Sequence, residues 1–417
     1  MIVKKKLSFF LLIILFLIMG TTMVSASENT TQTICEEDSS NVDYNQHDLY
    51  MDSNDNQAVN ENNIDKSYVD ESKASGNSDG SNQLKLNTTV ENKSVSLVYD
   101  TGKEVVITKN ITTVNGKSPE LVAKRCKFEE MTPIFPNEKI KLDIPGCSVS
   151  MRIVDLVSPV GKGQRGMIVS QPKAGKTTLL KDIAKSVLQN NKNMHMIILL
   201  IDERPEEVTD IKEAIKGDNV EVVYSTFDET PEHHKKVSEM VIERARRLVE
   251  SKEDVIILLD SITRLTRAYN QVIPPSGRTL SGGLDPAALH MPKKFFGAAR
   301  NMKEGGSLTI LATALVDTGS KMDDVVYEEF KGTGNMELVL DRKLSEKRVF
   351  PAIDIPKSGT RNEHLLLNAE ELNAISLMRR GFNGLKPDEA VDKVLDLFSK
   401  TKDNDEFVNM MNKSKWY

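Results

Sequence analysis

The chain has 417 residues, which is enough for two or three domains and for a well-buried core. Its 61 acidic residues outnumber the 55 lysines and arginines, giving a formal net charge of −6. A global basic field is therefore excluded as the means of attracting a nucleic acid, and any polyanion site must be local. Cys35, Cys126 and Cys147 are widely spaced and form no CxxC pair, which favours ordinary reduced thiols over a disulfide framework or a zinc site.

The N-terminus has the three-part pattern of a secretory signal peptide. Three lysines at 4–6 precede an apolar run at 7–20, and the small residues Val24, Ser25 and Ala26 follow. The run is shorter than the roughly 20 residues that a spanning helix prefers, so a cleaved leader and a short anchor both remain open. A wrongly chosen start or a fused gene fragment is the further alternative for residues 1–26.

Residues 27–92 are rich in Asn, Ser, Asp and Glu and hold few neighbouring apolar residues. Such a composition cannot bury enough apolar surface to offset chain entropy, so we predict a disordered, acidic linker. Asn-rich tracts can also associate as β-structure, but the density of acidic residues favours solvated disorder. From Ser94 to Val114 the alternating pattern predicts two short strands with a turn at 100–102, which is too little for a whole domain.

From Met151 onward the chain changes to apolar, β-branched runs separated by longer amphipathic segments. The runs read GMIVSQ, MIILLID, VEVVYSTF, DVIILLDS and SLTILATAL. Apolar strands that alternate with helices indicate an α/β fold whose parallel sheet is covered on both faces. We predict this core at 151–368, a linker leading into it at 119–150, and a helical C-terminal part at 369–417.

A phosphate-binding loop is predicted at the end of the first apolar strand. Residues 170–177 read SQPKAGKT, which keeps the GKT half of the P-loop pattern, with Ser170 where the regular pattern has its first glycine. A strand, a tight loop and a helix start would aim backbone amides at phosphate. Lys176 would then contact the β and γ phosphates of ATP, and Thr177 would be a ligand of Mg²⁺. A chance GKT that merely caps a helix is the alternative.

Two carboxylates stand at the ends of other apolar strands. Asp260 closes DVIILLDS, where a carboxylate has no packing value but could hold Mg²⁺ beside the P-loop, as a Walker B residue does. Glu203 closes another strand at the sheet edge where open α/β folds bind ligands, and is our candidate for the base that orients the attacking water. A surface turn of charged residues is the alternative for 202–204.

Six segments of the chain resemble a known family, both in their residues and in their order along the chain. They are GKGQRG at 161–166, PKAGKT at 172–177, LLIDERPEEVT at 199–209, IILLDSITRL at 256–265, GSKMDDVVYEEFKGTGNMEL at 319–338 and KRVFPAIDIPKSGTR at 347–361. Together they look like the ATPase core of Rho-type transcription termination factors. Catalytic subunits of rotary ATP synthases share the fold and the P-loop but are not expected to carry these strings.

The resemblance implies a RecA-like P-loop NTPase fold that assembles as a homohexameric ring, with ATP at each subunit interface and single-stranded RNA in the central channel. It places the catalytic glutamate at Glu203, an arginine finger at Arg361, an adenine-stacking ring at Phe350 and a nucleotide-contacting arginine at Arg204. The expected cofactor-binding residues are completed by Gly161, Lys162, Gly163, Gln164, Arg165, Gly166, Lys173, Ala174, Gly175, Lys176, Thr177 and Thr178.

Two loops carry the expectation of RNA binding. The segment 274–283, PPSGRTLSGG, resembles the family's channel-facing Q loop with Arg278 at its cationic position, and 319–324 resembles the R loop with Lys321 facing the strand. Loops of small residues with one cation can grip a phosphate backbone without reading bases. Taken alone, both loops would be read as plain connectors.

The N-terminal part departs from the family. Rho-type proteins carry an OB-like domain whose aromatic residues stack on RNA, whereas here 93–118 resembles only the tail of that domain. Three functions stay open: a terminator that moves 5′ to 3′ along nascent RNA and acts on the transcription complex, an RNA-stimulated ATPase that does not terminate, and an exported non-enzymatic protein favoured only by the leader. ATP and nascent transcripts favour a cytoplasmic location, in conflict with that leader.

Overall fold

The computed structural model describes residues 94–98, 104–108, 117–382, 384–385 and 387–413. The predicted leader at 1–26 and acidic linker at 27–92 lie outside these residues. The two short strands predicted after Ser94 are present as β1 (Ser94–Val98) and β2 (Glu104–Thr108), which pair antiparallel with Ser96 opposite Val106.

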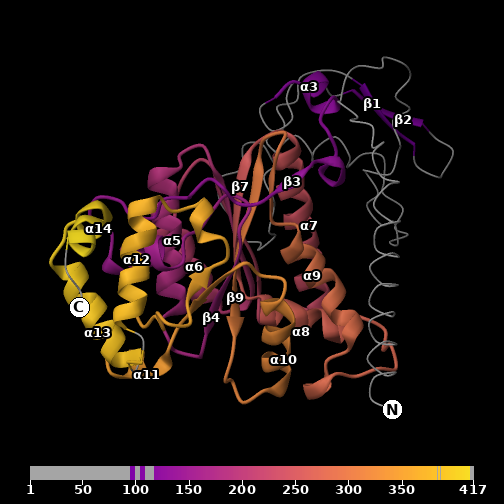
Figure 1. Cartoon of the computed structure of the whole chain (residues 1–417). Coiled ribbons are helices and arrows are strands. Elements are labelled where there is room, and N and C mark those ends of the chain that lie inside the picture. Colours follow the sequence, from indigo (N-terminus) through magenta and orange to yellow (C-terminus); the bar gives the residue numbers. More distant parts are fainter. Residues whose placement is uncertain (1–93, 99–103, 109–116, 383, 386, 414–417) are drawn as a thin grey trace, which may run out of the picture. The chain divides into compact units, whose positions relative to one another are not determined.

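A large, mostly parallel sheet forms the centre of the core (Figure 1). In sheet order, the main path is β11 (Gly359–Thr360), β10 (Met336–Val339), β4 (Arg165–Ser170), β9 (Ser307–Leu315), β7 (Asp254–Asp260), β5 (His195–Glu203) and β6 (Val220–Thr226). The five apolar runs predicted as parallel strands are confirmed as β4, β5, β6, β7 and β9. The edge strand β11 runs antiparallel to β10, and the short β3 (Pro133–Ile134) and β8 (Arg300–Met302) extend the sheet beside β9.

Side chains that alternate along each strand divide the core into two apolar layers. On β4, Ile168 belongs to one layer and Met167 to the other, and on β5 Ile198 and Ile197 do the same. Because both faces are buried, the strands read as continuous apolar runs. Figure 1 shows helices on both sides of the sheet. Those of the first layer are α4 (Val149–Val157), α5 (Lys176–Asn190), α6 (Pro205–Ala214), α12 (Ala369–Gly381), α13 (Pro387–Ser399) and α14 (Asn404–Lys413). Those of the second are α7 (Pro231–Glu250), α8 (Ile262–Val272), α9 (His290–Gly297) and α10 (Lys321–Lys331).

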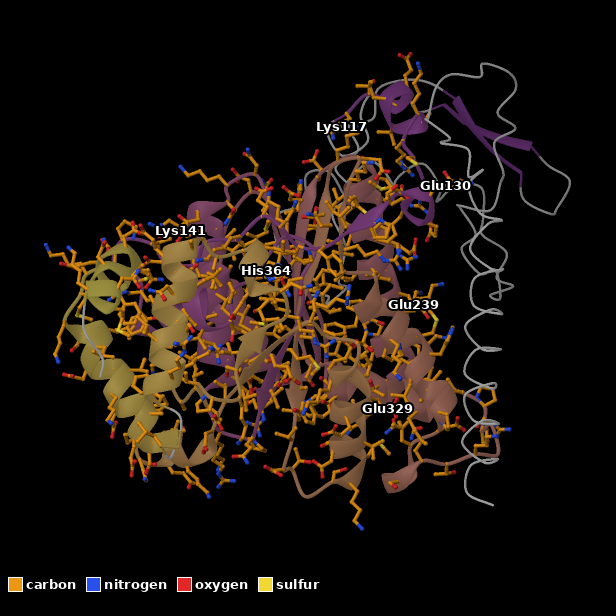
Figure 2. The ribbon with its side chains drawn as sticks, viewed as in Figure 1. Lys117, Glu130, Lys141, Glu239, Glu329 and His364 are labelled. Atoms are coloured by element: carbon orange, nitrogen blue, oxygen red, sulfur yellow. The ribbon has the colours of Figure 1, made fainter. Side chains whose placement is uncertain are left out.

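The start of the predicted linker is fastened to the end of α7. Glu250, whose side chain is 1% exposed, accepts hydrogen bonds from Arg125 Nε at 2.6 Å and from the Phe128 amide at 3.0 Å. Lys117 donates to the carbonyl of Ser251 at 2.5 Å, where α7 ends (Figure 2). Short elements continue this segment: α3 (Pro119–Ala123), the 3-10 turn η2 (Phe128–Glu130) and β3. Residues 117–134 are thus fastened to the α/β core and are not a free tether.

The C-terminal helices predicted after Ala369 are confirmed and are tied to the core through α4. Arg152 is 4% exposed and donates to the carbonyls of Phe398, Thr401 and Asp403 at 2.6 to 3.0 Å. Asn404 donates to Asp155 at 3.2 Å. Within the described residues, none of the helices is both long and apolar enough to cross a bilayer.

Short elements complete the chain between these parts. They are the 3-10 turns η3 (Ser281–Gly283), η4 (Pro286–Leu289) and η5 (Glu363–Leu365) and the helix α11 (Arg342–Glu346).

Candidate ATP and RNA sites

The predicted phosphate loop lies between β4 and α5, at the carboxyl edge of the parallel strands. Gly175 caps α5 with φ of 94° and Lys173 has φ of 66°, so the loop makes the left-handed turns that a tight strand-to-helix connection requires. Thr177 and Thr178 follow in the first turn of α5, where backbone amides are free to meet phosphate. The local geometry is that of a P-loop.

Three side chains predicted to do chemistry meet at this edge. Lys176 Nζ lies 2.9 Å from Glu203 Oε1 and 2.5 Å from Asp260 Oδ1. Glu203 is 3% exposed and Asp260 is 1% exposed, each at the last residue of its strand. Neighbouring parallel strands end at one edge, and this brings together residues that are far apart in the chain.

Burial and mutual repulsion dominate the electrostatics of the two carboxylates in this cluster. Burial, together with the nearby Asp260, raises the pKa of Glu203 to about 7, although Lys176 and Arg264 act in the opposite direction. Burial favours the neutral amine of Lys176, but Asp260 and Glu203 outweigh it and raise the pKa of that lysine above its usual value. Two buried carboxylates share one partly buried lysine, an arrangement that suits an added cation.

Mg²⁺ fits these residues. It prefers oxygen ligands and is usually held in ATPases by one or two protein oxygens plus the phosphates. Asp260 offers a buried carboxylate, and Thr177 offers a hydroxyl in the first turn of α5. No cluster of three or more His, Cys, Asp or Glu side chains suited to a metal occurs among the described residues, so a site of this kind would be completed by the nucleotide.

Arg264 is a member of the site that sequence reasoning missed. Its guanidinium lies 3.4 Å from Asp202 and 3.6 Å from Glu203 Oε2. It stands on α8, which begins directly after Asp260, and so its position follows from the strand-to-helix turn that also places Asp260. The string IILLDSITRL contained it, but an arginine in a helix carries no signal of its own.

Phe350 and Arg204 lie where contact with a nucleotide is possible. A Cβ atom built on Gly175 would stand 4.0 Å from a ring carbon of Phe350, so the ring is beside the P-loop. Half of Phe350 is exposed, which leaves an apolar ring free to stack. The helix α11 fixes this segment, since Ser345 Oγ donates to the Lys173 carbonyl at 3.1 Å. Arg204 is exposed and directly follows Glu203.

The expected cofactor residues at 161–166 are not brought to the P-loop of the same chain. They occupy the opposite end of β4, where Lys162 pairs with Asp254 at 2.9 Å and Arg165 donates to the Thr333 carbonyl. Their small residues serve close packing: a Cβ on Gly163 would stand 2.2 Å from the Asn301 amide nitrogen. The strand that separates this end from the P-loop runs from Arg165 to Ser170, which is about 17 Å of extended chain.

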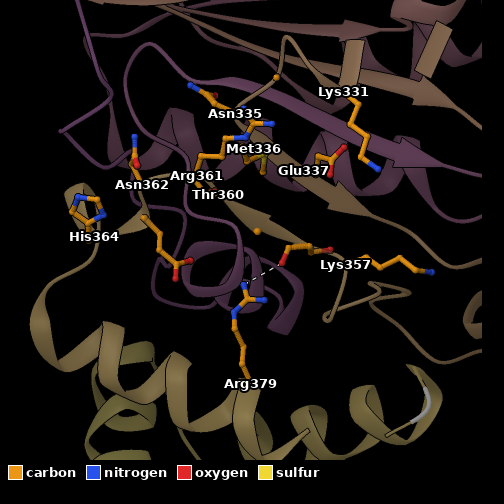
Figure 3. Close-up of a pocket in the computed structure, with 14 residues that line it drawn as sticks. Lys331, Asn335, Met336, Glu337, Lys357, Thr360, Arg361, Asn362, His364 and Arg379 are labelled. Atoms are coloured by element: carbon orange, nitrogen blue, oxygen red, sulfur yellow. Dashed lines mark hydrogen bonds between the residues drawn. The ribbon is translucent and has the colours of Figure 1, made fainter. Parts of the chain in front are cut away.

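Arg361 lies at that same far end of the sheet. It follows β11, whose Thr360 pairs with Met336, and Met336 in turn pairs with Gly166 near the start of β4. Arg361 lines a cavity of about 570 Å³. Figure 3 shows Arg361 in this cavity together with Arg379, which comes from α12, and Glu337, which lies on β10. Arg361 and Lys176 of one chain are thus at opposite ends of the sheet.

The two loops expected to bind RNA are in contact with one another. Gly282 has φ of 77°, and a Cβ atom there would stand 2.4 Å from the Met322 amide nitrogen. Arg278 is exposed in the first loop, and Lys321 is exposed at the first residue of α10, where the second predicted loop ends. The two loops are far apart in the sequence, so only the structure shows that they are in contact.

A second arginine on α8 holds the loop at 319–324. Arg267 makes two hydrogen bonds of 2.7 Å to Asp323, which is 1% exposed and also accepts from Thr318 Oγ1 at 2.6 Å. Arg267 stands one turn after Arg264, the residue that contacts Glu203. A single helix therefore contacts both the carboxylate cluster and the loop that carries Lys321.

Comparison with known proteins defines the class that this fold and site indicate. The nucleotide-binding domain of the ATP synthase alpha/beta family matches residues 150–360, so the chain is a P-loop ATPase of that type. The assembled ATPase EscN of the enteropathogenic E. coli type III secretion system superimposes with a TM-score of 0.55, at 20% identity, covering 76% of this chain and 78% of that one. At that identity the likeness concerns the fold alone.

The particular family is narrower. Transcription termination factor Rho of Bacillus subtilis is 60% identical over 303 residues, which are 73% of this chain and 70% of that protein. Transcription termination factor Rho of Pseudomonas aeruginosa is 56% identical over 304 residues, 72% of each chain. The chain belongs to the transcription termination factor Rho family.

Proposed function

We propose that the chain is an RNA-dependent ATPase that moves 5′ to 3′ along nascent single-stranded RNA and releases the transcript from the DNA template. The observation that carries this proposal is the meeting of Lys176, Glu203 and Asp260 at one sheet edge, in a chain of the Rho family. ATP is the expected nucleotide because of the family match at 150–360.

The chemistry follows from how the cluster is arranged before ATP arrives. Lys176 is held by two carboxylates, and we expect its ammonium group to move onto the β and γ phosphates when ATP binds. Glu203 is then free to accept a hydrogen bond from the attacking water and to orient it. Mg²⁺ bound by Thr177, Asp260 and phosphate oxygens would neutralise the charge that develops on the transferred phosphoryl group.

Arg361 requires a second copy of the chain. Because it lies at the opposite end of the sheet from Lys176, we assign it to the ATP of a neighbouring subunit, where its guanidinium would stabilise charge in the transition state. The open cavity beside it has room for groups of that neighbour. This assignment makes hydrolysis dependent on a ring, which we take to be a homohexamer, as expected from the sequence.

RNA binding is assigned to the paired loops. Arg278 and Lys321 are exposed cations on adjoining segments. The net charge of −6 gives the chain no general attraction for RNA, so binding requires a local cationic site of this kind. The helix α8 joins the loop at Lys321 to the carboxylates through Arg267 and Arg264. RNA bound at these segments could therefore change the position of Glu203 through α8, which is a physical reason for RNA-dependent hydrolysis.

A second candidate is an RNA-stimulated ATPase that does not terminate transcription. It is favoured by the N-terminal part, since neither β1 nor β2 carries an aromatic residue that could stack on a base. We assign the working location to the cytoplasm, where ATP and nascent transcripts meet; the signal-like segment at 1–26 lies outside the described residues.

The test is hydrolysis of ATP by the full chain with and without poly-cytidine RNA, with Lys176→Ala as the control. We expect RNA-stimulated hydrolysis that the substitution abolishes. Absence of hydrolysis at high RNA and low salt would contradict the motor and turn attention to the leader. Release of transcripts from a stalled transcription complex separates the two candidates, because only a terminator releases RNA.

A further inference from the structure

Strand β9, which lies between β4 and β7, contains two fully buried threonines, Thr309 and Thr313. A buried hydroxyl costs free energy unless it finds a hydrogen-bond partner, and each of these has one. Thr309 accepts from the Gly163 amide at 2.9 Å, at the end of the sheet far from the P-loop. Thr313 lies at the end that carries the ATP site, and nothing in the chemistry described above uses it.

The partner of Thr313 is Asp260. Thr313 Oγ1 donates to Asp260 Oδ1 at 2.7 Å, and Lys176 Nζ lies 2.5 Å from the same oxygen. Within the part of the chain that the structure describes, the other oxygen, Oδ2, has no hydrogen-bond partner. One side of the carboxylate is therefore fixed by two donors while the other is left for a ligand.

Binding of ATP is expected to change which donors contact Asp260 Oδ1. If Lys176 transfers to the phosphates, as the proposed function requires, Thr313 is the donor that remains on Oδ1. The terminal torsion of an aspartate is broad and roughly two-fold, so a carboxylate without a fixed donor turns easily. Threonine is β-branched and stiff at χ1, and Thr313 is 0% exposed within the sheet, so its hydroxyl is a rigid reference point.

We propose that Thr313 is a positioning residue for the metal ligand Asp260: its hydroxyl holds Oδ1 and thereby presents Oδ2 to the divalent cation that accompanies ATP. This inference rests on the proposed function and adds a residue to it. Partners in the outer shell of a metal ligand typically change metal affinity or activity by about 10- to 100-fold when removed, which sets the expected size of the effect.

The test compares Thr313→Val with Thr309→Val in the full chain. Valine keeps the approximate shape of threonine and replaces the hydroxyl with a methyl group, so the hydrogen bond is lost. Thr309→Val loses a buried hydroxyl from the same strand at the end away from Asp260, and so it controls for the cost to stability. The readout is the affinity for a fluorescent, non-hydrolysable ATP analogue, measured with Mg²⁺ and with EDTA. The ratio of the two affinities reports how well the metal is held, independently of turnover.

We expect Thr313→Val to reduce this ratio about 10-fold and to raise the Mg²⁺ concentration for half-maximal hydrolysis by a similar factor. Thr313→Ser should restore both, whereas Thr309→Val should leave the ratio unchanged even where it lowers the melting temperature. An unchanged ratio of the affinities with Mg²⁺ and with EDTA in Thr313→Val overturns the inference. If that variant does not fold, the same ratio is measured on Thr313→Ala, where an unchanged value overturns the inference in the same way. Failure of the wild-type chain to hydrolyse ATP would instead count against the proposed function.

Discussion

Replacement of Glu203 by glutamine is expected to stop hydrolysis and, at alkaline pH, to stabilise the nucleotide-free protein. The pKa of Glu203 is about 7 in the folded chain, against an ordinary value of 4.5, because the side chain is buried beside Asp260. This difference corresponds to about 3 kcal/mol. Because the pKa is higher in the folded state, ionisation of Glu203 lowers the free energy of unfolding. This loss is absent below about pH 4.5 and complete above pH 7. Glutamine is neutral at every pH, so the variant does not lose this free energy.

The assay is thermal unfolding of the full chain without nucleotide at pH 5 and at pH 8. Glu203→Gln should melt above the wild type by roughly 6 °C at pH 8, with little difference at pH 5. Hydrolysis should fall by about 100-fold or more, as on removal of a general base. Glu213→Gln, which changes an exposed carboxylate on α6, is the matched control and should do neither. A lower melting temperature at pH 8, or an equal gain at both pH values, would refute the reasoning.

Three further outcomes are expected. The value of kcat/KM for ATP should fall about tenfold per pH unit below pH 7, as Glu203 takes up a proton in the free enzyme; a flat profile down to pH 5 would exclude it as the base. Arg361→Ala should lower kcat by about 1,000-fold. Rings mixed from Arg361→Ala and Lys176→Ala subunits should recover part of the activity, because some interfaces then join an intact Arg361 to an intact Lys176. No recovery would argue against action between subunits. Gly282→Ala should weaken RNA binding, measured by fluorescence anisotropy, far more than Gly277→Ala, because both have φ of 77° but only the first would meet backbone, at 2.4 Å; equal losses would contradict the loop contact.

The sequence predicted those parts of the fold that depend on local pattern. Strands β4, β5, β6, β7 and β9 were predictable because a strand buried on both faces must be apolar along its whole length. A carboxylate that ends such a run has no packing role, so the sequence predicted Asp260 and Glu203 as site residues, and the structure places each at the last residue of its strand. Their common edge follows from the parallel direction of the strands.

Contacts between distant segments were beyond the reach of these patterns. Thr313 reads as an ordinary β-branched strand residue, and only its register beside Asp260 gives it a role. Arg264 reads as a solvated helix residue, although it lies 3.6 Å from Glu203. The family resemblance placed the segment 161–166 among the cofactor-binding residues, but the extended strand Arg165–Ser170 separates this segment from the P-loop of the same chain by the depth of the sheet.

The antiparallel edge strand is the structural reason for our proposal that the ATP site is divided between subunits. A chain that continued in parallel after β10 would return its functional residues to the carboxyl edge, beside its own P-loop. Instead β11 reverses direction, with Thr360 opposite Met336, and delivers Arg361 to the other end of the sheet. Lys176, Glu203 and Asp260 stay at the first end as an under-neutralised carboxylate pair with one lysine. Each copy therefore offers an arginine at one end of the sheet and a pair of buried carboxylates at the other, which is the heterologous pairing that the proposed ring requires.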